Sequence, residues 1–274
     1  MSGPGSRMDG AERLDQHLVR TRVARSRTAA QRLVRGGAVQ VDGVTIDKPS
    51  YAVGPGHQVR VTAEGESRWV GRGALKLLHA LTTWGVDVTG RRCLDVGAST
   101  GGFTQVLLEH GASHVTALDV GHDQLVDELV ADARVTDLPG TNIRDVGPEQ
   151  LGTFDLVVGD VSFISLRLVL PAVAPLVEPD GDVIVLVKPQ FEVGRERLGH
   201  GGVVSSAAER ARALRDVVGA ATDLGWQAHG IERSPVTGTH GNTEYLLWLA
   251  AYSAGMMEPG ATSARIRALT EEDE

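Results

Sequence analysis

The sequence predicts an α/β protein in which a doubly wound, Rossmann-like sheet of mainly parallel strands follows a small α+β domain. Two observations support this prediction. From Gly71 onward, short apolar runs alternate with segments of helical periodicity, which is the pattern of strand–helix–strand units. The stretch before Gly71 instead indicates two helices and a hairpin. At 274 residues, the chain is long enough for one large and one small domain.

The small domain is predicted from the N-terminal seventy residues. A first helix is indicated by apolar residues at helical spacing in residues 14–19, and a second is expected from the candidate N-cap Ser26 to Arg35. Two alternating segments then flank the turn Asp42-Gly43, a pattern typical of a β-hairpin. The expected strands are residues 38–41, 44–46 and 59–61.

The small domain is basic, whereas the rest of the chain is acidic. Residues 1–70 contain 11 Lys and Arg against 7 Asp and Glu, and the remaining residues contain 16 against 28. Between Gln16 and Val41 there are six arginines and no acid. This asymmetry predicts that the small domain faces a polyanion. A solvated helical face is the alternative interpretation.

The same stretch resembles the alpha-L RNA-binding module of a small-subunit ribosomal protein and of many pseudouridine synthases. The matching motifs are Arg13-Leu-Asp15, Ala24-Arg-Ser-Arg27, Ala30, Leu33-Val34 and Gly37-Ala-Val-Gln-Val-Asp-Gly43. The resemblance implies a domain at residues 1–66, with about the first eight disordered, and a linker at residues 67–73. It also implies that arginines contact the RNA backbone. The candidates are Arg13, Arg20, Arg22, Arg25, Arg27, Arg32 and Arg35.

The large domain is expected at residues 74–274. Its expected strands are residues 92–96, 115–119, 134–136, 156–160, 183–187, 227–232 and 245–251. The expected helices are residues 102–110, 124–131, 166–173 and 206–224.

A glycine-rich turn joins the first of these strands to its helix. Its spacing, Gly97-x-x-x-Gly101-Gly102, differs from the dinucleotide fingerprint, and it lacks the Lys-Ser/Thr of a P-loop. The acid before it, Asp95, suits a cationic ligand such as S-adenosylmethionine, and Asp119 is placed to accept ribose hydroxyls. A tight structural turn is the alternative. The expected cofactor contacts are Asp95, Gly97, Ala98, Ser99, Thr100, Gly101, Gly102, Phe103, Asp119, Asn142 and Asp160.

Lysine is rare in this chain, since only three of its 27 positively charged residues are lysines. Arginine is permanently charged, whereas a lysine amine can lose its proton. Lys188 directly follows the apolar run 183–187, where a parallel sheet delivers side chains to a ligand crevice. Lys76 is the second candidate for a chemical role. Lys48 lies in the turn Asp47-Lys-Pro49 and is interpreted as a turn residue.

These motifs resemble the TlyA family, within the FtsJ-like class of ribose methyltransferases, over almost the whole chain. The matching segments are Asp95-Val-Gly-Ala-Ser-Thr-Gly-Gly-Phe-Thr104, Asp119-Val-Gly121, Asp160-Val-Ser-Phe-Ile-Ser165, Lys188-Pro-Gln-Phe-Glu-Val-Gly194 and Gly241-Asn-Thr-Glu-Tyr245. The resemblance implies S-adenosylmethionine-dependent methylation of cytidine 2′-hydroxyls in small- and large-subunit ribosomal RNA. It also implies a Lys-Asp-Lys-Glu tetrad. Its members here are Lys76, Asp160, Lys188 and Glu244.

Each tetrad member has an implied role and a plainer alternative. Lys188 is the expected general base or proton-steering group, and Lys76 the group that holds the ribose or phosphate. Asp160 and Glu244 are expected to orient the lysines. Asp160 could instead be a capping carboxylate, Glu244 a surface acid, and Lys76 a residue that only decorates a helix. Asn142 could contact the adenine edge of the cofactor or could be a turn residue. Phe163 could stack on the target base or could belong to the core.

Other functions fit the sequence less well. A base-directed amino methyltransferase would place an Asn/Asp-Pro-Pro motif where this chain has Asp160-Val-Ser-Phe163. A non-catalytic ribosome-assembly factor would not need all four tetrad positions. A membrane-lytic protein would need an apolar span or a basic amphipathic helix. The single cysteine and the scattered histidines predict that no metal is bound. Because the N-terminal segment lacks a signal-peptide core and no apolar run reaches membrane length, we expect a cytoplasmic protein that is not in a membrane, and no obligate protein partner is expected.

Overall fold

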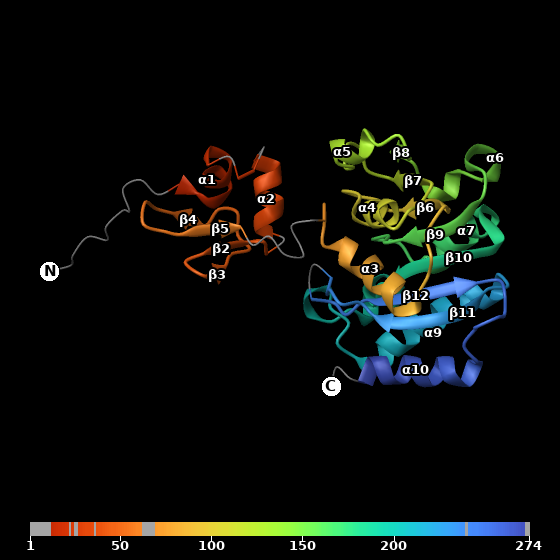
Figure 1. Cartoon of the computed structure of the whole chain (residues 1–274). Coiled ribbons are helices and arrows are strands. Elements are labelled where there is room, and N and C mark those ends of the chain that lie inside the picture. The colour runs from red at the N-terminus through yellow and green to blue at the C-terminus, as the bar shows by residue number, and fades with distance from the viewer. Residues whose placement is uncertain are drawn as a thin grey trace. The chain divides into compact units, whose positions relative to one another are not determined.

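The computed structural model divides the chain into two compact units, residues 1–72 and 73–274 (Figure 1). The described residues are 12–21, 23–24, 27–35, 37–61, 69–238 and 241–271. The N-terminal eight residues, Ser26 and part of the predicted linker lie outside them. Within the described ranges, no helix is both long enough and apolar enough to cross a membrane.

The small unit contains both predicted helices and the predicted hairpin. Its elements are β1 (Glu12–Arg13), α1 (Leu14–Arg20), α2 (Arg27–Arg35), β2 (Val39–Val41), β3 (Val44–Thr45), β4 (Ala52–Val53) and β5 (Val59–Val61). β2 pairs antiparallel with both β3 and β5. Asp42 and Gly43 both have positive φ angles, 53° and 81°, as a two-residue hairpin turn requires. The pairing of β1 with β4 was not predicted, because two-residue strands show no alternation.

The large unit is a seven-stranded sheet covered by helices. In chain order its elements are α3 (Gly73–Trp84), β6 (Arg92–Val96), α4 (Gly102–Glu109), β7 (His114–Asp119), α5 (Asp127–Val130), β8 (Val135–Pro139), α6 (Pro148–Leu151), β9 (Phe154–Gly159), α7 (Leu166–Val173), β10 (Val177–Val187), α8 (Pro189–Glu192), α9 (Ala207–Asp223), β11 (Gln227–Arg233), β12 (Tyr245–Ala250) and α10 (Pro259–Glu271). Short 3-10 turns, η1 to η4, are Ile143–Asp145, Ala174–Leu176, Arg195–Arg197 and His200–Gly202.

The strand order is β11-β12-β10-β9-β6-β7-β8. The pairs from β10 to β8 are parallel, and β12 runs antiparallel to β10 and β11. This topology confirms the predicted doubly wound, mainly parallel sheet. Strand β10 begins at Val177 rather than at residue 183, since its charged N-terminal half still pairs with β9 across a register shift.

Four helices of the large unit were not predicted: the four-residue helices α6 and α8, and the longer helices α3 and α10. Helix α3 has apolar residues at helical spacing, of which Ala74, Leu77 and Ala80 are buried. The signal was therefore present in the sequence. Helix α10 contacts α9 and β11 and buries Ile266 and Leu269. Its apolar stripe is narrow, because most of its residues are small or polar.

Asp182, which is 2% exposed, fixes the register of β10 and β12 at the end of these strands opposite to Lys188. Its carboxylate accepts hydrogen bonds from Trp248 Nε1 and Tyr252 Oη, each at 2.7 Å, and pairs with Arg91 Nη1 at 2.5 Å. Burial and the hydrogen bond to Asp182 raise the pKa of Tyr252 to about 12. Asp182 pairs with Ala250 across β10 and β12, six residues before Lys188. It therefore ties together the strands that end at the candidate site.

We predict that Asp182→Ala lowers the free energy of unfolding by about 3 kcal/mol, because three buried or half-buried donors lose a charged acceptor. Chemical denaturation measures this change. Asp180→Ala is the matched control, since Asp180 is exposed on the same strand. Its effect should stay within about 0.5 kcal/mol. If Asp182→Ala also lowered the free energy of unfolding by no more than about 0.5 kcal/mol, the Asp182 network would contribute little to stability.

Candidate active site

The four tetrad residues converge although they lie far apart in the chain. Lys76 Nζ lies 2.8 Å from Glu244 Oε2 and 3.2 Å from Asp160 Oδ2. Lys188 Nζ lies 2.6 Å from Asp160 Oδ1. Asp160 therefore stands between two ammonium groups, and all four side chains are largely shielded from water. The alternative of a surface acid does not hold for Glu244, whose side chain is 3% exposed.

The sheet explains why these residues meet. Val187, the last residue of β10, pairs with Tyr245, the first residue of the antiparallel strand β12. Lys188 and Glu244 are the next residues outward on those two strands. Asp160 directly follows β9, which is parallel to β10. Lys76 comes from the N-terminal part of α3, so its side chain completes the group from a helix rather than from a strand.

The charges within the tetrad are mutually stabilising. Burial alone would raise the pKa of the Asp160 carboxyl, but the lysines on both sides outweigh burial and hold this pKa below its usual range. Burial alone would likewise lower the pKa of the Lys76 amine. Asp160 and Glu244 together reverse that effect, so the pKa of Lys76 is raised. Lys76 is therefore held as an ammonium ion between two carboxylates.

Two glycines allow this close packing. A Cβ atom at Gly238 would lie 2.6 Å from Glu244 Oε1, so any larger residue would displace that carboxylate. A Cβ atom at Gly97 would lie 3.0 Å from the carbonyl oxygen of Asp160. Gly97 also has a φ of 83°, a conformation that favours glycine. The glycine loop thus packs directly against the strand end that presents Asp160.

Asp119 holds the glycine loop in place. Its carboxylate accepts hydrogen bonds from the backbone nitrogens of Ser99 and Gly121, both at 2.8 Å. Ser99 adopts a positive φ of 49°, which brings its N–H to Asp119. Gln124 Nε2 also donates to it, at 3.4 Å. Because an ionised carboxylate has about four acceptor positions, these three bonds leave capacity for a ribose hydroxyl.

Asp95 is fully buried and only half satisfied. Thr104 donates its hydroxyl to Asp95 Oδ2 at 2.7 Å, whereas Oδ1 has no hydrogen-bond partner within the described ranges. Burial raises the pKa of Asp95 to about 7, and the charges of Asp160 and Asp119 act in the same direction. A buried carboxylate oxygen without a partner is costly. The unsatisfied Oδ1 suits the cationic donor that S-adenosylmethionine carries, although the Asp95 side chain is 0% exposed, so the ligand must open a path to it on binding.

Two of the expected cofactor residues have other tasks. Asn142 is the N-cap of η1, since its side chain accepts a hydrogen bond from the backbone nitrogen of Arg144 at 3.1 Å. The Asn142 side-chain oxygen is therefore used within the turn, as the turn interpretation predicts. Phe103 is 4% exposed on α4, so its side chain belongs to the core and offers a ligand almost no surface. Only the backbone at this position remains a candidate contact.

An exposed aromatic ring lies beside the tetrad. Phe163 is 91% exposed and has a φ of 66°, a strained conformation for a bulky residue that costs about 1–3 kcal/mol. Its ring centroid lies 5.2 Å from that of Phe191, and Lys188 Nζ lies 6.0 Å from the Phe191 ring. The core interpretation of Phe163 is therefore wrong. An aromatic held outward in this way can stack on a base.

In the small unit, a buried carboxylate organises two of the predicted RNA-contacting arginines. Asp15 is fully buried and pairs with Arg13 Nε at 2.9 Å and with Arg27 Nε at 3.1 Å. Gln31 Nε2 donates to it at 3.0 Å. These donors, led by Arg13, hold the pKa of Asp15 far below its usual range despite burial. Both guanidinium groups remain half-exposed and point outward from a fixed anchor.

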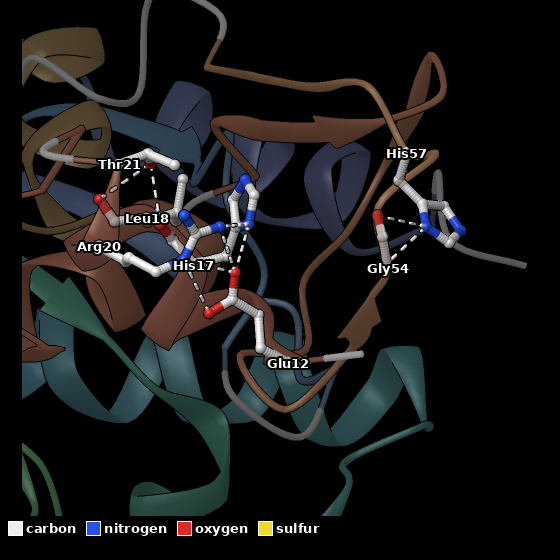
Figure 2. Close-up of polar contacts among 7 residues, drawn as sticks. All are labelled: Glu12, His17, Leu18, Arg20, Thr21, Gly54 and His57. Carbon is white, nitrogen blue, oxygen red and sulfur yellow. Dashed lines mark hydrogen bonds and ion pairs between the residues drawn. The ribbon is translucent and has the colours of Figure 1, made fainter. Parts of the chain in front are cut away.

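Arg20 is held by a different acid. Glu12 accepts hydrogen bonds from its Nη2 at 2.6 Å and its Nε at 2.9 Å, and His17 Nδ1 lies 2.8 Å from the same Glu12 oxygen (Figure 2). Arginines of the acid-free segment between Gln16 and Val41 therefore form ion pairs with acids that precede this segment, Glu12 and Asp15. Arg22 and Arg25, and the side chains of Arg32 and Arg35, lie outside the described part of the small unit.

Sequence reasoning missed three contributors to this site. They are Gly238, which makes room for Glu244, Thr104, which fixes Asp95, and Ser162, which accepts a hydrogen bond from Lys188 Nζ at 2.7 Å. Thr104 and Ser162 stood within motifs that had been singled out. Because Ser162 lies only two residues beyond Asp160, its hydroxyl could have been predicted to contact the tetrad. Gly238 gave no signal, because only the folded loop brings it to Glu244.

The comparisons with known proteins agree with this geometry. A model of the FtsJ-like methyltransferase family matches residues 69–251, and an S4 domain model matches residues 12–59. A Mycobacterium tuberculosis protein named 16S/23S rRNA (cytidine-2′-O)-methyltransferase TlyA is 47% identical over 94% of this chain and 97% of its own. A Campylobacter jejuni protein named 23S rRNA (cytidine-2′-O)-methyltransferase TlyA is 38% identical over 66% of this chain and 70% of its own.

A solved structure from Streptococcus thermophilus, described as a candidate hemolysin, is also similar. It superposes with a TM-score of 0.75 at 36% identity and covers 97% of this chain and 98% of its own. The fold and the family match define an S-adenosylmethionine-dependent methyltransferase of the FtsJ-like class with an N-terminal S4 domain. Within that class, the chain belongs to the TlyA family.

We predict that binding of S-adenosylmethionine strengthens as the pH rises from about 5.5 toward the Asp95 pKa of about 7. The raised pKa keeps Asp95 protonated below that value, so a cationic ligand must displace a proton, at up to about tenfold in affinity per pH unit. Calorimetric titration at several pH values measures this slope. Asp95→Asn should remove it. An unchanged slope in that variant would assign the pH dependence to another group.

Proposed function

We propose that this protein transfers a methyl group from S-adenosylmethionine to the 2′-hydroxyl of cytidines in small- and large-subunit ribosomal RNA. The observation that supports this most directly is the network of Lys76, Asp160, Lys188 and Glu244 at the strand ends beside the Asp95 loop. A hydroxyl acceptor needs a group that removes its proton, and this network contains two amines within a shielded site. The names of the relatives point to the same substrate.

The two lysines have different roles in this proposal. Lys76 pairs with two carboxylates, and its raised pKa keeps it an ammonium ion that can hold the ribose or an adjacent phosphate. Within the described residues, Lys188 pairs with Asp160 alone among the acids, and it contacts the exposed residue Ser162. We therefore assign proton removal to Lys188. Its amine must be neutral when the ribose hydroxyl arrives. Asp160 orients both lysines, and Glu244 orients Lys76.

The cofactor would be held by the glycine loop and its flanking acids. Asp95 Oδ1 would accept from its amino group, Asp119 from its ribose, and residues 97–102 would contact it through their backbone. Asn142, through its amide nitrogen, and Asp160 would complete the pocket. When bound, S-adenosylmethionine supplies a methyl group activated by a sulfonium. The protein's own residues orient the acceptor oxygen, exclude water and move the proton.

RNA would be recognised by both units. The S4 domain would bind the phosphate backbone through the predicted arginines, of which Arg13, Arg20 and Arg27 are held by acids. In the large unit, Phe163 would stack on the base of the target nucleotide. Base–aromatic stacking contributes about 1–3 kcal/mol per base, comparable to the strain at Phe163.

The main test is methyl transfer from labelled S-adenosylmethionine to purified ribosomal subunits, followed by nuclease mapping and nucleoside mass spectrometry. Label on the cytidine 2′-oxygen is expected. Label on a base, or no label, would contradict the proposal. Lys188→Ala should lower the rate by at least about 100-fold while cofactor affinity stays within about twofold. Lys188→Arg should fail equally, because a guanidinium cannot lose its proton. Full activity in that variant would remove proton transfer from Lys188.

A second prediction separates charge from geometry in the S4 domain. Asp15→Asn and Asp47→Asn each remove one negative charge, so both would strengthen RNA binding if charge alone mattered. Because Asp15 anchors two guanidinium groups, we expect Asp15→Asn to weaken binding by about five- to tenfold, roughly 1 kcal/mol. Asp47 is exposed and holds neither of these arginines, so Asp47→Asn should bind at least as tightly as the natural chain. Dissociation constants for an rRNA fragment across a salt series measure this difference. Equal strengthening in both variants would make the anchors irrelevant to binding.

A further inference from the structure

Lys188 has a hydroxyl partner that the tetrad does not include. Its Nζ donates a hydrogen bond to Ser162 Oγ at 2.7 Å, about as close as its contact with Asp160 Oδ1 at 2.6 Å. Ser162 is exposed, whereas the Lys188 side chain is only 9% exposed. The hydroxyl therefore lies between a buried amine and solvent.

A base that takes one proton per turnover must lose that proton before the next turnover. The neighbours of Lys188 within the tetrad are poor acceptors. Asp160 has a lowered pKa and is shared with Lys76, and Lys76 is itself an ammonium ion. Glu244 is bonded to Lys76 and is buried. With RNA covering the site, Lys188 would have little direct contact with water.

From this geometry we propose that Ser162 is the relay through which Lys188 passes its proton to solvent. The inference rests on the proposed function, since it assumes that Lys188 takes the ribose proton. The step is balanced by a paired transfer. As the Lys188 ammonium gives a proton to Ser162 Oγ, the hydroxyl proton of Ser162 passes to water or buffer. Both side chains return to their starting forms, and one proton leaves per methyl group transferred.

The segment that presents Ser162 is held in place from both sides. Ahead of it, the carbonyl of Asp160 packs against Gly97. Behind it, Glu192 accepts hydrogen bonds from Ser165 Oγ at 2.5 Å and from the backbone nitrogen of Leu166 at 2.8 Å. Ser162 is thus fixed at hydrogen-bond distance from Lys188 rather than placed there by a free loop. A relay requires such a fixed distance, because proton transfer follows an existing hydrogen bond.

The test compares Ser162→Ala with Ser162→Thr under multiple turnover. Ser162→Ala should lower kcat by about tenfold and leave the KM values for RNA and S-adenosylmethionine unchanged. Increasing imidazole at constant pH and ionic strength should restore its rate, because a small base can accept the proton directly. Ser162→Thr keeps the hydroxyl and should retain most of the activity without imidazole. Cofactor affinity and melting temperature should match the natural chain in both variants.

Ser263→Ala is the matched control, since it removes an exposed hydroxyl on α10 that contacts the Pro259 carbonyl and no residue of the tetrad or of the Ser162 segment. Any rate that it loses should not respond to imidazole. Full kcat in Ser162→Ala at low buffer would overturn the relay, as would a loss that neither imidazole nor threonine restores. If the natural chain does not methylate ribose at all, the proposed function fails first. The Ser162 result alone therefore decides the relay only in an active enzyme.

Discussion

The sharing of Asp160 by two buried lysines is the interaction on which the rest of the site depends. Two shielded ammonium groups without partners would each cost several kcal/mol. With Asp160 between them and Glu244 behind Lys76, every charge has a counterion within 3.2 Å. The arrangement binds together α3, the end of β9, the end of β10 and the start of β12. None of these segments can shift alone without leaving a buried charge unpaired.

The sheet register makes that sharing possible. Strands β10 and β12 are locked at one end by the Asp182 network and deliver Lys188 and Glu244 at the other. Six residues of paired strand separate the two ends, roughly 20 Å. A slip of one residue would turn these side chains to the opposite face of the sheet. The Asp182 network therefore helps to set the positions of Lys188 and Glu244 from the opposite end of their strands.

The sheet and the glycine loop could be predicted because each follows from local patterns, whereas the tetrad came from the resemblance to the TlyA family. All seven expected strands formed, and the inner strands such as β9 and β12 carry nearly continuous, buried apolar runs, whereas the edge strand β8 is only partly buried. The partners of the arginines could not be predicted in this way. Glu12 and Asp15 reach arginines up to twelve residues away through a fold of paired helices, and Gly238 meets Glu244 only in a closed loop. Such contacts depend on tertiary packing, which periodicity does not encode.

Both units place one carboxylate between two cations, but the two groups differ in net charge. Asp15 leaves its group with one positive charge, and its two guanidinium groups stay half-exposed, which suits an anionic backbone. The tetrad adds Glu244 and becomes neutral when both lysines are protonated. A neutral, shielded group does not hold a phosphate tightly through net charge. Under the proposed function, RNA docking is therefore favoured in the S4 domain, and the tetrad would bind and release a single proton.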